Sequence, residues 1–323
     1  MKKIFITRNI PEKGINSLRE KGYEVIVGKS KIPPTQKEII KEIKNKNYDV
    51  VITLLTDKID GKVFDASPST KLFANYAIGY DNIDFKEATK RDIAITNTPG
   101  NYVDGIAQHT IALLLALMSR LVEADTFMRK GKYKGWDPML FLGDKLQGKT
   151  VAVIGTGRIG EQVARKLHDG FGAKIIYYDV VRNQQIEKDC DAEFMQSVDE
   201  ALSRADVVSL HVPLLDSTRH LINKENLKKM KPSAYLVNTS RGAVIDENAL
   251  VYALKNGQIK GAGLDVYEFE PKLAKGLMKL PNTVFSPHIA SAQIEAREEM
   301  SRVLVENVID FLEGRTPRNK VNQ

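Results

Sequence analysis

The sequence predicts an α/β fold with two domains, each built on a parallel β-sheet. Strand-like and helix-like segments alternate along the 323 residues. Parallel sheets require this order, because a crossing helix must return the chain between parallel strands. In addition, 323 residues are many for one domain and enough for two domains that each have a core.

The chain up to residue 100 alternates five predicted strands with four predicted helices. The strands are expected at residues 3–7, 23–27, 50–54, 71–74 and 93–96. The helices are expected at residues 11–21, 35–45, 61–66 and 84–90. This part contains no glycine fingerprint for phosphate, so we predict that it binds the substrate.

A long apolar helix is predicted next, at residues 103–128, and its segment 111–118 is apolar on most faces. Such a helix must be buried on most faces, either by the second domain or by another subunit. Residues 130–146 are rich in Gly and Lys and contain Trp136, the single tryptophan. We predict a loop or arm there, and a contact between subunits.

The following segments predict the second domain and a final helix. Strands are expected at residues 150–154, 174–178, 207–210, 234–238, 263–266 and 283–285. Helices are expected at residues 158–170, 198–204, 224–230 and 247–256, the last of them with Gly257 as its C-cap. A helix at residues 293–313 follows the last strand, and we predict that it crosses back onto the first domain.

The turn after the strand at residues 150–154 carries the glycine pattern of a dinucleotide site. Gly155 permits a tight turn, Gly157 admits a pyrophosphate close to the backbone, and Gly160 lets the next helix pack on the sheet. The N-terminus of that helix favours a phosphate. Glycines in ordinary turns give a similar pattern, but a strand, a helix, a second strand and a terminal acid in this order are specific to dinucleotide sites.

Asp179 is that terminal acid. It lies 19 residues after Gly160, where a carboxylate accepts hydrogen bonds from the adenosine ribose. Its charge would repel a 2′-phosphate, so the sequence predicts NAD and makes NADP the weaker alternative. Arg182, three residues later, would partly reverse that preference.

Composition and charge exclude several classes of protein. The chain has no apolar run of about 18 residues, and its first residues are typical of a strand instead of a signal peptide. We therefore expect a soluble, cytoplasmic protein with no membrane partner. The single cysteine, Cys190, excludes an internal disulfide and a cysteine metal cluster. The net charge is +7, but Lys and Glu are interspersed, so we predict no nucleic-acid partner.

Three functional side chains follow predicted strands of the second domain, at the edge where such sheets bind ligands. They are Arg241, Glu270 and His288. A guanidinium can bind the carboxylate and carbonyl of a 2-oxo acid, and a histidine can give a proton to the carbonyl oxygen during hydride transfer. A neighbouring glutamate favours the imidazolium form. Taken singly, each residue is more typical of a surface charge, a turn or a helix cap; their joint placement favours catalysis.

The other histidines are weaker candidates. His109 falls in the long helix, His168 in the helix after the glycines, and His220 in a polar connection. His211 ends a strand near the cofactor, where we expect its backbone to matter more than its ring.

Seven segments in order resemble one known family, the D-isomer-specific 2-hydroxyacid dehydrogenases. They are residues 75–84, 96–100, 155–160, 211–214, 238–242, 263–268 and 287–289. The resemblance implies an α/β fold of two Rossmann-like or flavodoxin-like domains with parallel sheets, the NAD-binding domain being inserted into a discontinuous substrate domain. It places the substrate-binding (catalytic) domain at residues 1–100 plus 290–323, the dinucleotide-binding domain at 101–289, and an arm that forms a homodimer at about 101–145.

The resemblance also assigns roles to single residues. Arg241 is expected to bind the substrate, His288 to be the acid/base, and Glu270 to tune it. Asp265 is expected to contact the nicotinamide carboxamide.

Two sets of binding residues follow from the motifs and the resemblance together. The cofactor-binding set is Gly155, Gly157, Arg158, Ile159, Gly160, Asp179, His211, Val212, Pro213, Thr218, Thr239, Asp265 and His288. The substrate-binding set is Leu54, Ile78, Gly79, Arg241 and Ser291, in which the backbone amides of Ile78 and Gly79 hold the substrate carboxylate. No metal is expected.

Within the family, three parts of the chain resemble the glyoxylate/hydroxypyruvate reductase branch: residues 54–60, 136–138 with 142–143, and 287–291. This implies NADH-dependent reduction of a small 2-oxo acid such as glyoxylate or hydroxypyruvate. D-lactate dehydrogenase and short-form D-3-phosphoglycerate dehydrogenase remain alternatives, as does a binding protein similar to the NAD-sensing corepressors. Many relatives in this branch carry a neutral or basic run where Asp179 stands and look NADP-dependent, so Asp179 is a departure from their pattern.

Overall fold

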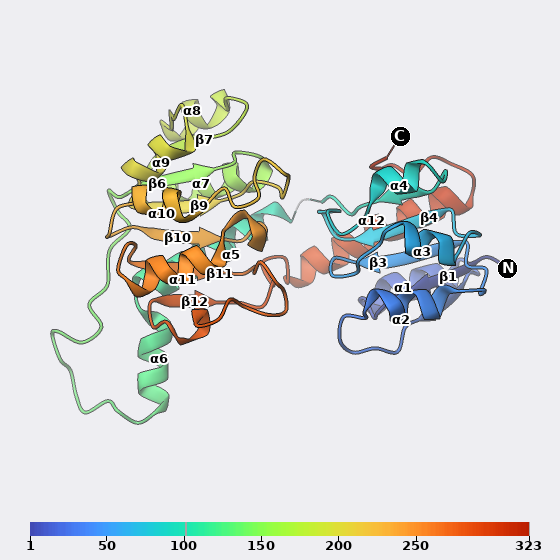
Figure 1. Cartoon of the computed structure of the whole chain (residues 1–323), viewed down its shortest axis with the longest axis horizontal. Helices are drawn as coiled ribbons and strands as arrows, with labels where there is room; N and C mark the ends of the chain where they lie inside the picture. Colours follow the sequence, from blue (N-terminus) through green and yellow to red (C-terminus); the bar gives the residue numbers. More distant parts are fainter. Residues whose placement is uncertain (101, 323) are drawn as a thin grey trace. The chain divides into compact units, whose positions relative to one another are not determined.

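The computed structural model describes residues 1–100 and 102–322 and divides into two compact units (Figure 1). Unit 1 comprises Met1–Tyr102 and Ala292–Gln323, and unit 2 comprises Val103–Ser291. Unit 2 is therefore inserted into the sequence of unit 1. The sequence analysis predicted domain boundaries after residues 100 and 289. Asn101, the first residue of the predicted second domain and arm, lies outside the described residues.

Unit 1 is built on a five-stranded parallel sheet in the order β2-β1-β3-β4-β5. Its strands are β1 (Lys3–Ile6), β2 (Glu24–Val27), β3 (Val50–Leu54), β4 (Leu72–Tyr76) and β5 (Ala94–Thr96). Its helices are α1 (Glu12–Glu20), α2 (Gln36–Ile43), α3 (Gly61–Ala66), α4 (Phe85–Thr89) and α12 (Ile294–Leu312).

Alternate residues of the unit 1 strands face two helical layers. Phe5 and Phe73 lie in one apolar cluster with Ile39 of α2 and Phe64 of α3. On the other face α12 packs against β4 and α1, so the predicted return of the final helix to the first domain is confirmed (Figure 1). Both faces of the sheet are covered, which is why its inner strands β1, β3 and β4 carry apolar residues on both sides.

Unit 2 is built on a seven-stranded parallel sheet in the order β12-β11-β10-β9-β6-β7-β8. Its strands are β6 (Thr150–Ile154), β7 (Lys174–Tyr178), β8 (Glu193–Phe194), β9 (Val207–Leu210), β10 (Tyr235–Asn238), β11 (Gly261–Leu264) and β12 (Thr283–Phe285). Its α-helices are α5 (Val103–Met118), α6 (Leu121–Arg129), α7 (Arg158–Phe171), α8 (Gln184–Cys190), α9 (Val198–Arg204), α10 (Lys224–Lys229) and α11 (Glu247–Lys255). Short 3₁₀ turns occupy Gly242–Val244 and Leu277–Lys279.

The unit 2 sheet is also buried on both faces, and adjacent residues of β6 show this directly. Ala152 belongs to a cluster with Leu202 of α9 and Leu250 of α11. Val153 belongs to a second cluster, with residues of α5, α7 and α8 that include Val163. The predicted α/β fold with two parallel sheets is confirmed.

The predicted helix over residues 103–128 is wrong as one helix, because it breaks between α5 and α6. Arg120 adopts a left-handed conformation with φ 53°. Its guanidinium pairs with Glu123 at 2.7 Å and lies over the Phe141 ring at 5.2 Å, and both contacts favour the break. Burial also changes there, since α5 has eight buried residues and α6 has none. The segment 130–146 contains no helix or strand, as predicted.

Other helices and strands differ from the prediction for local reasons. The sequence missed α8 and β8, although Asn183 caps α8 by accepting from two backbone amides. Strand β11 begins at Gly261, two residues before the predicted start. The prediction missed this start because glycine is not typical of a strand. Glycine is needed there, since a Cβ on Gly261 would lie 2.8 Å from the Asn282 carbonyl oxygen. Within the described residues, no helix is long and apolar enough to cross a bilayer.

The turn between β6 and α7 needs glycine at two positions. Gly155 has φ 91°, and a Cβ there would lie 2.8 Å from the backbone of His211 at the end of β9. A Cβ on Gly160 would lie 2.0 Å from the carbonyl oxygen of Gly155. The turn is thus packed against both its own helix and the next strand, which no larger residue permits.

His211, at the end of β9, is the residue whose backbone contacts Gly155. Its backbone N–H donates to the Ile154 carbonyl at 2.8 Å, and its ring Nε2 lies 2.8 Å from the Ser209 hydroxyl. Burial lowers the pKa of His211 from its ordinary 6.5 to about 4. The ring is therefore neutral near pH 7 and belongs to the packed interior of the turn.

Two substitutions on α7 test the close approach of Gly160 to the carbonyl oxygen of Gly155. Gly160→Ala should lower the free energy of unfolding by more than about 3 kcal/mol, because its Cβ meets backbone that cannot move aside. Gly170→Ala, on the same helix and with open space around it, should raise that free energy by about 0.5–1 kcal/mol. Urea unfolding followed by circular dichroism measures both. A Gly160→Ala variant as stable as wild type contradicts the packing described.

A pH series on the protein without cofactor tests the burial of His211. Because its folded pKa lies below the unfolded value, its contribution to stability is complete above pH 6.5 and is lost as the pH falls to about 4. At pH 4, the free energy of unfolding of wild type should have fallen by up to about 3 kcal/mol more than that of His211→Asn. His168→Asn, at the surface of α7, is the matched control and should follow wild type. Parallel stability curves for wild type and His211→Asn contradict the buried neutral ring.

Candidate active site

The carboxyl ends of β6, β9, β10, β11 and β12 form one edge of the unit 2 sheet, because these strands are neighbours and parallel. The loops that leave this edge carry most of the predicted site residues. Ligands of such sheets bind at this edge.

Asp179 is bonded directly to the glycine turn. Its Oδ2 accepts the Thr156 backbone N–H at 2.6 Å and the Thr156 hydroxyl at 3.1 Å, while its Oδ1 accepts the Val180 N–H at 2.7 Å. Gly157 has open space where a Cβ would stand, and Arg158 begins α7 as an exposed residue. The turn, the helix N-terminus and the acid thus have the arrangement that a dinucleotide requires.

Arg182, the residue that could favour a 2′-phosphate, has partners of its own. Its Nε lies 2.6 Å from Glu187 and its guanidinium lies over the Phe194 ring at 5.8 Å. The hydrogen bond with Glu187 raises the pKa of Arg182. A 2′-phosphate would have to compete with that carboxylate for the guanidinium.

His288 and Glu270 form a pair. The Nδ1 atom of His288 lies 3.0 Å from Glu270 Oε2, and the other carboxylate oxygen accepts the Tyr267 N–H at 3.0 Å. The His288 N–H donates to the Asp265 carbonyl at 2.8 Å, and both side chains of the pair are about a quarter exposed. The imidazole is therefore oriented through Nδ1, and the transfer of a substrate proton at Nε2 stays a prediction.

Asp265 holds the loop that carries His288. Its carboxylate is fully buried and accepts the Ser286 hydroxyl at 2.6 Å and the N–H groups of Ile289 and Ala290 at 2.8 Å each. Burial acts to raise the pKa of Asp265, but these bonds and one from His109 outweigh it and lower the pKa. The expected contact of Asp265 with the nicotinamide carboxamide stays a prediction.

His109 is a residue that the sequence analysis undervalued. Its Nε2 lies 2.9 Å from the Ser286 hydroxyl and 3.4 Å from Asp265 Oδ1. Helix geometry accounts for this placement. Leu113 packs on Gly263 of β11, so His109, one helical turn earlier, lies beside Asp265 at the end of the same strand.

Arg241 lies in the loop after β10, next to the loop that carries Glu270. Its backbone carbonyl accepts the Asn238 side-chain amide at 2.9 Å, and its Nη1 donates to the Ser240 carbonyl at 2.8 Å. A Cβ on Gly242 would lie 1.8 Å from the backbone of Tyr267. The two loops are therefore pressed together, and glycine permits this.

The remaining cofactor candidates of unit 2 stabilise loops at the same edge. The Thr218 hydroxyl donates to the Pro213 carbonyl at 2.6 Å and accepts the Leu215 N–H at 2.8 Å, which closes the loop after His211. The Thr239 hydroxyl lies 2.8 Å from that of Thr110 on α5. Val212 contacts the turn, with its side chain 2.9 Å from the position of a Cβ on Gly155. Ile159 lies in α7, and Ser291 is the last residue of unit 2.

Unit 1 brings together Leu54, Ile78 and Gly79. Leu54 ends β3 and pairs with Tyr76, after which β4 leads into Ile78. The Leu54 N–H donates to the buried carboxylate of Asp57 at 2.8 Å. Each unit thus gathers its own candidates at the carboxyl edge of its sheet. Among the described residues, no three His, Cys, Asp or Glu side chains are grouped to hold a metal ion.

The comparisons with known proteins agree with this geometry. Residues 111–290 match the family model of the D-isomer specific 2-hydroxyacid dehydrogenase, NAD binding domain. A glyoxylate reductase from Thermococcus litoralis is 48% identical over 325 residues, covering 99% of this chain and 97% of that protein. A glyoxylate reductase from Korarchaeum cryptofilum is 47% identical, covering 99% of this chain and 96% of that protein.

Solved structures show the same relationship. The NADPH-dependent glyoxylate/hydroxypyruvate reductase of Sinorhizobium meliloti, in complex with NADP and malonate, is similar with a TM-score of 0.87 and 30% identity, covering 99% of this chain and 96% of that chain. A protein of Thermus thermophilus has a TM-score of 0.91 and 41% identity, covering 99% of both chains. The chain therefore belongs to the family of D-isomer-specific 2-hydroxyacid dehydrogenases.

Proposed function

We propose that the protein reduces a small 2-oxo acid, glyoxylate or hydroxypyruvate, with NADH as the reductant. The observation that carries the proposal is the Glu270–His288 pair, which lies at the carboxyl edge of the sheet in the same unit as the glycine turn and Arg241. The glyoxylate reductases that are 46–48% identical over 99% of the chain support this choice of substrate.

Each residue has one task in the proposed reaction. The guanidinium of Arg241 binds the carboxylate and the carbonyl oxygen of the 2-oxo acid, for which its planar fork is suited. His288 gives a proton to the carbonyl oxygen, and Glu270 orients its imidazole through Nδ1. The N–H groups of Ile78 and Gly79 bind the substrate carboxylate. NADH, when bound, supplies the hydride.

NAD is the proposed cofactor, with NADP disfavoured. Asp179 stands where a 2′-phosphate would be repelled, and Arg182 is paired with Glu187. The remaining cofactor candidates of unit 2 would line the dinucleotide. In this proposal unit 1 binds the substrate and unit 2 binds the dinucleotide.

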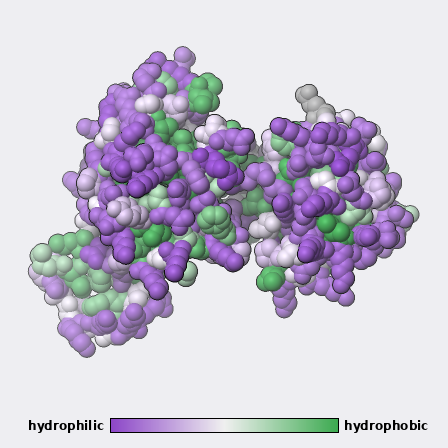
Figure 2. Space-filling model, viewed as in Figure 1, coloured by the Kyte–Doolittle hydropathy of each residue, from purple (hydrophilic) through white to green (hydrophobic). Residues whose placement is uncertain are grey.

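We also propose a homodimer formed through α6 and the segment after it, in a cytoplasmic protein. Apolar side chains gather over this arm, and Figure 2 shows them at its lower left. The exposed residues are Leu121, Val122, Met128, Tyr133, Trp136, Met139, Leu140 and Leu142. Trp136 is 83% exposed, and a contiguous apolar surface of this kind is typical of a protein interface. A second copy of the chain would cover it.

Loss of absorbance at 340 nm tests the reaction. NADH and then NADPH are supplied with glyoxylate, hydroxypyruvate, pyruvate and 3-phosphohydroxypyruvate. Fast turnover of the first two acids with NADH is the expected result. Preference for pyruvate or the phosphorylated acid assigns the enzyme to a lactate or phosphoglycerate dehydrogenase. Absence of turnover with all four leaves the corepressor-like binding protein as the better description.

Two substitutions test the catalytic roles. His288→Gln should lower kcat by about 10²–10⁴, because no other group gives the proton. Arg241→Lys should lower kcat/KM by about 100-fold, since an ammonium cannot reproduce the planar fork. His168→Gln on the surface of α7 is the control and should keep wild-type kinetics. Wild-type turnover by either site variant removes that residue from the mechanism.

The dimer is tested at α6. Wild type should sediment at twice the chain mass of 36.1 kDa. The double variant Leu121→Asp with Met128→Asp should sediment as a monomer, because each change places a charge in an apolar interface. Met278→Asp changes a residue that is 75% exposed elsewhere in unit 2, and should leave the mass unchanged. A monomeric wild type contradicts the proposed interface.

A further inference from the structure

The loop after β4 is fastened on one side by residues 97 and 98. The Thr98 N–H donates to the Ala77 carbonyl at 2.9 Å. The side-chain amide of Asn97 donates to the next carbonyl, that of Ile78, at 2.7 Å. A third carbonyl, that of Gly79, accepts the buried Asn75 amide at 2.9 Å. Three consecutive carbonyl groups of this loop therefore have fixed directions.

The direction of each carbonyl fixes the N–H of the same peptide. In a planar trans peptide the C=O and N–H point to opposite sides. With the Ala77 and Ile78 carbonyls turned toward residues 97 and 98, the N–H groups of Ile78 and Gly79 point away from them, side by side. Within the described residues, neither N–H donates a hydrogen bond. Two adjacent donors with this orientation can bind the two oxygens of one carboxylate.

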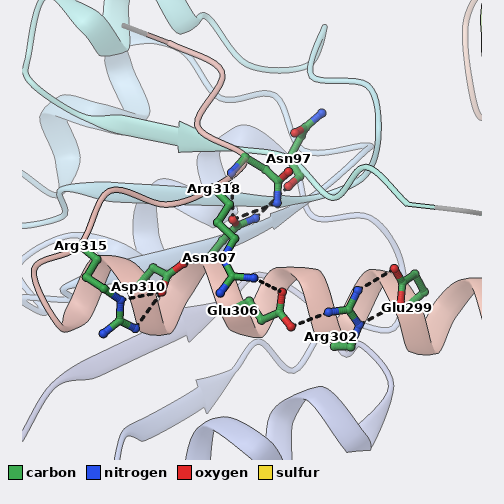
Figure 3. Close-up of polar contacts among 9 residues, drawn as sticks. Asn97, Glu299, Arg302, Glu306, Asn307, Asp310, Arg315 and Arg318 are labelled. Atoms are coloured by element: carbon green, nitrogen blue, oxygen red, sulfur yellow. Dashed lines mark hydrogen bonds and ion pairs between the residues drawn. The ribbon is translucent and has the colours of Figure 1, made fainter.

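Asn97 is itself held from both sides of its backbone. Its carbonyl accepts the side-chain amide of Asn307, a fully buried residue of α12, at 3.0 Å. Its N–H donates to the Asn319 carbonyl at 3.3 Å. The oxygen of the Asn307 side chain, which Figure 3 labels, accepts both the N–H and the side-chain amide of Asn319 at 3.2 Å. One asparagine of α12 thus joins Asn97 to the segment that follows this helix.

The segment after α12 adds to the edge of the sheet at β5. Lys320 forms an antiparallel bridge with Thr96, and the Val321 N–H donates to the Ile95 carbonyl at 2.9 Å. The Asn322 side chain accepts the Ile95 N–H at 2.8 Å and donates to the Ile93 carbonyl at 2.8 Å. These bonds place Asn319 beside Asn97 and leave little freedom to either.

Ion pairs along α12 contribute less to this arrangement. Arg318 lies 3.6 Å from Glu306 and 3.5 Å from Asp310, and its side chain is 70% exposed (Figure 3). Exposed pairs of this kind contribute at most about 1 kcal/mol and weaken in salt. The buried amide contacts of Asn307 are therefore the stronger link.

We infer that Asn97 is a positioning residue that aims the N–H groups of Ile78 and Gly79 at a substrate carboxylate, and that Asn307 and residues 319–322 brace it. The inference rests on the proposed function, which assigns the carboxylate to these two amides. Asn97 acts through the backbone of the loop and not by touching the substrate. A change of Asn97 should therefore weaken binding of the 2-oxo acid more than it slows the reaction, and should leave NADH binding unchanged.

Two variants of the full chain test the inference. Asn97→Ala removes the amide, and Asn97→Asp keeps the size of the side chain but replaces the donor by an acceptor. Both should raise KM for glyoxylate about tenfold or more, change kcat less than threefold, and keep the wild-type KM for NADH. Arg318→Ala, next to the bracing segment and changing an exposed side chain that makes only ion pairs, is the control and should keep all three constants. An unchanged KM for glyoxylate in both Asn97 variants overturns the inference.

A second readout separates this inference from the proposed function. The amide signals of Ile78 and Gly79 in the ¹⁵N-labelled protein with NADH are followed during a titration with oxamate, a carboxylate that is not reduced. Both signals should shift in wild type, and Asn97→Asp should need about tenfold more oxamate. Shifted amides without turnover of any 2-oxo acid would keep the inference and remove the proposed function. Turnover without a shift at these amides, or wild-type titration by Asn97→Asp, would overturn the inference.

Discussion

The buried carboxylate of Asp265 is the interaction on which the unit 2 site depends. A charge without solvent is tolerated only where hydrogen-bond donors replace the water. Here the donors come from Ser286, from the N–H groups of Ile289 and Ala290, and at 3.4 Å from His109. Satisfying that charge therefore gives the loop one conformation. His288 lies inside this loop with φ 54°, a conformation that needs such support, and Glu270 only completes its orientation.

In unit 1, neutral groups hold the loop after β4 in one conformation. In the proposed reaction this loop must leave the N–H groups of Ile78 and Gly79 free, and the carbonyls of the same two peptides accept from the Thr98 N–H and the Asn97 side-chain amide. Neutral amides suit this place because they bring no charge that would repel an anion. In both units the residues that touch a ligand in the proposed reaction are held by polar groups one step further from it, as precise positioning requires.

The sequence predicted much of the frame because the physical signals were local. The strands Val50–Leu54, Val207–Leu210 and Thr283–Phe285 were predicted to the residue, since apolar runs bounded by turns define buried strands. Arg241, Glu270 and His288 could be predicted to lie at one edge because parallel strands bring their carboxyl ends together, and their catalytic roles stay predictions. The break at Arg120 was missed because it depends on Glu123 and Phe141 instead of on a glycine. His109 and Asn97 were missed because their partners lie far away along the chain.

The insertion of unit 2 has a consequence for the order of events during synthesis. All of Val103–Ser291 is contiguous, so unit 2 can fold as soon as this stretch has left the ribosome. Unit 1 must wait, because α12 packs against α1 and β4 and is translated after every residue of unit 2. The N-terminal part of unit 1, Met1–Tyr102, therefore spends most of translation with part of one face of its sheet uncovered, and it is the part of the nascent chain that a chaperone would need to shield.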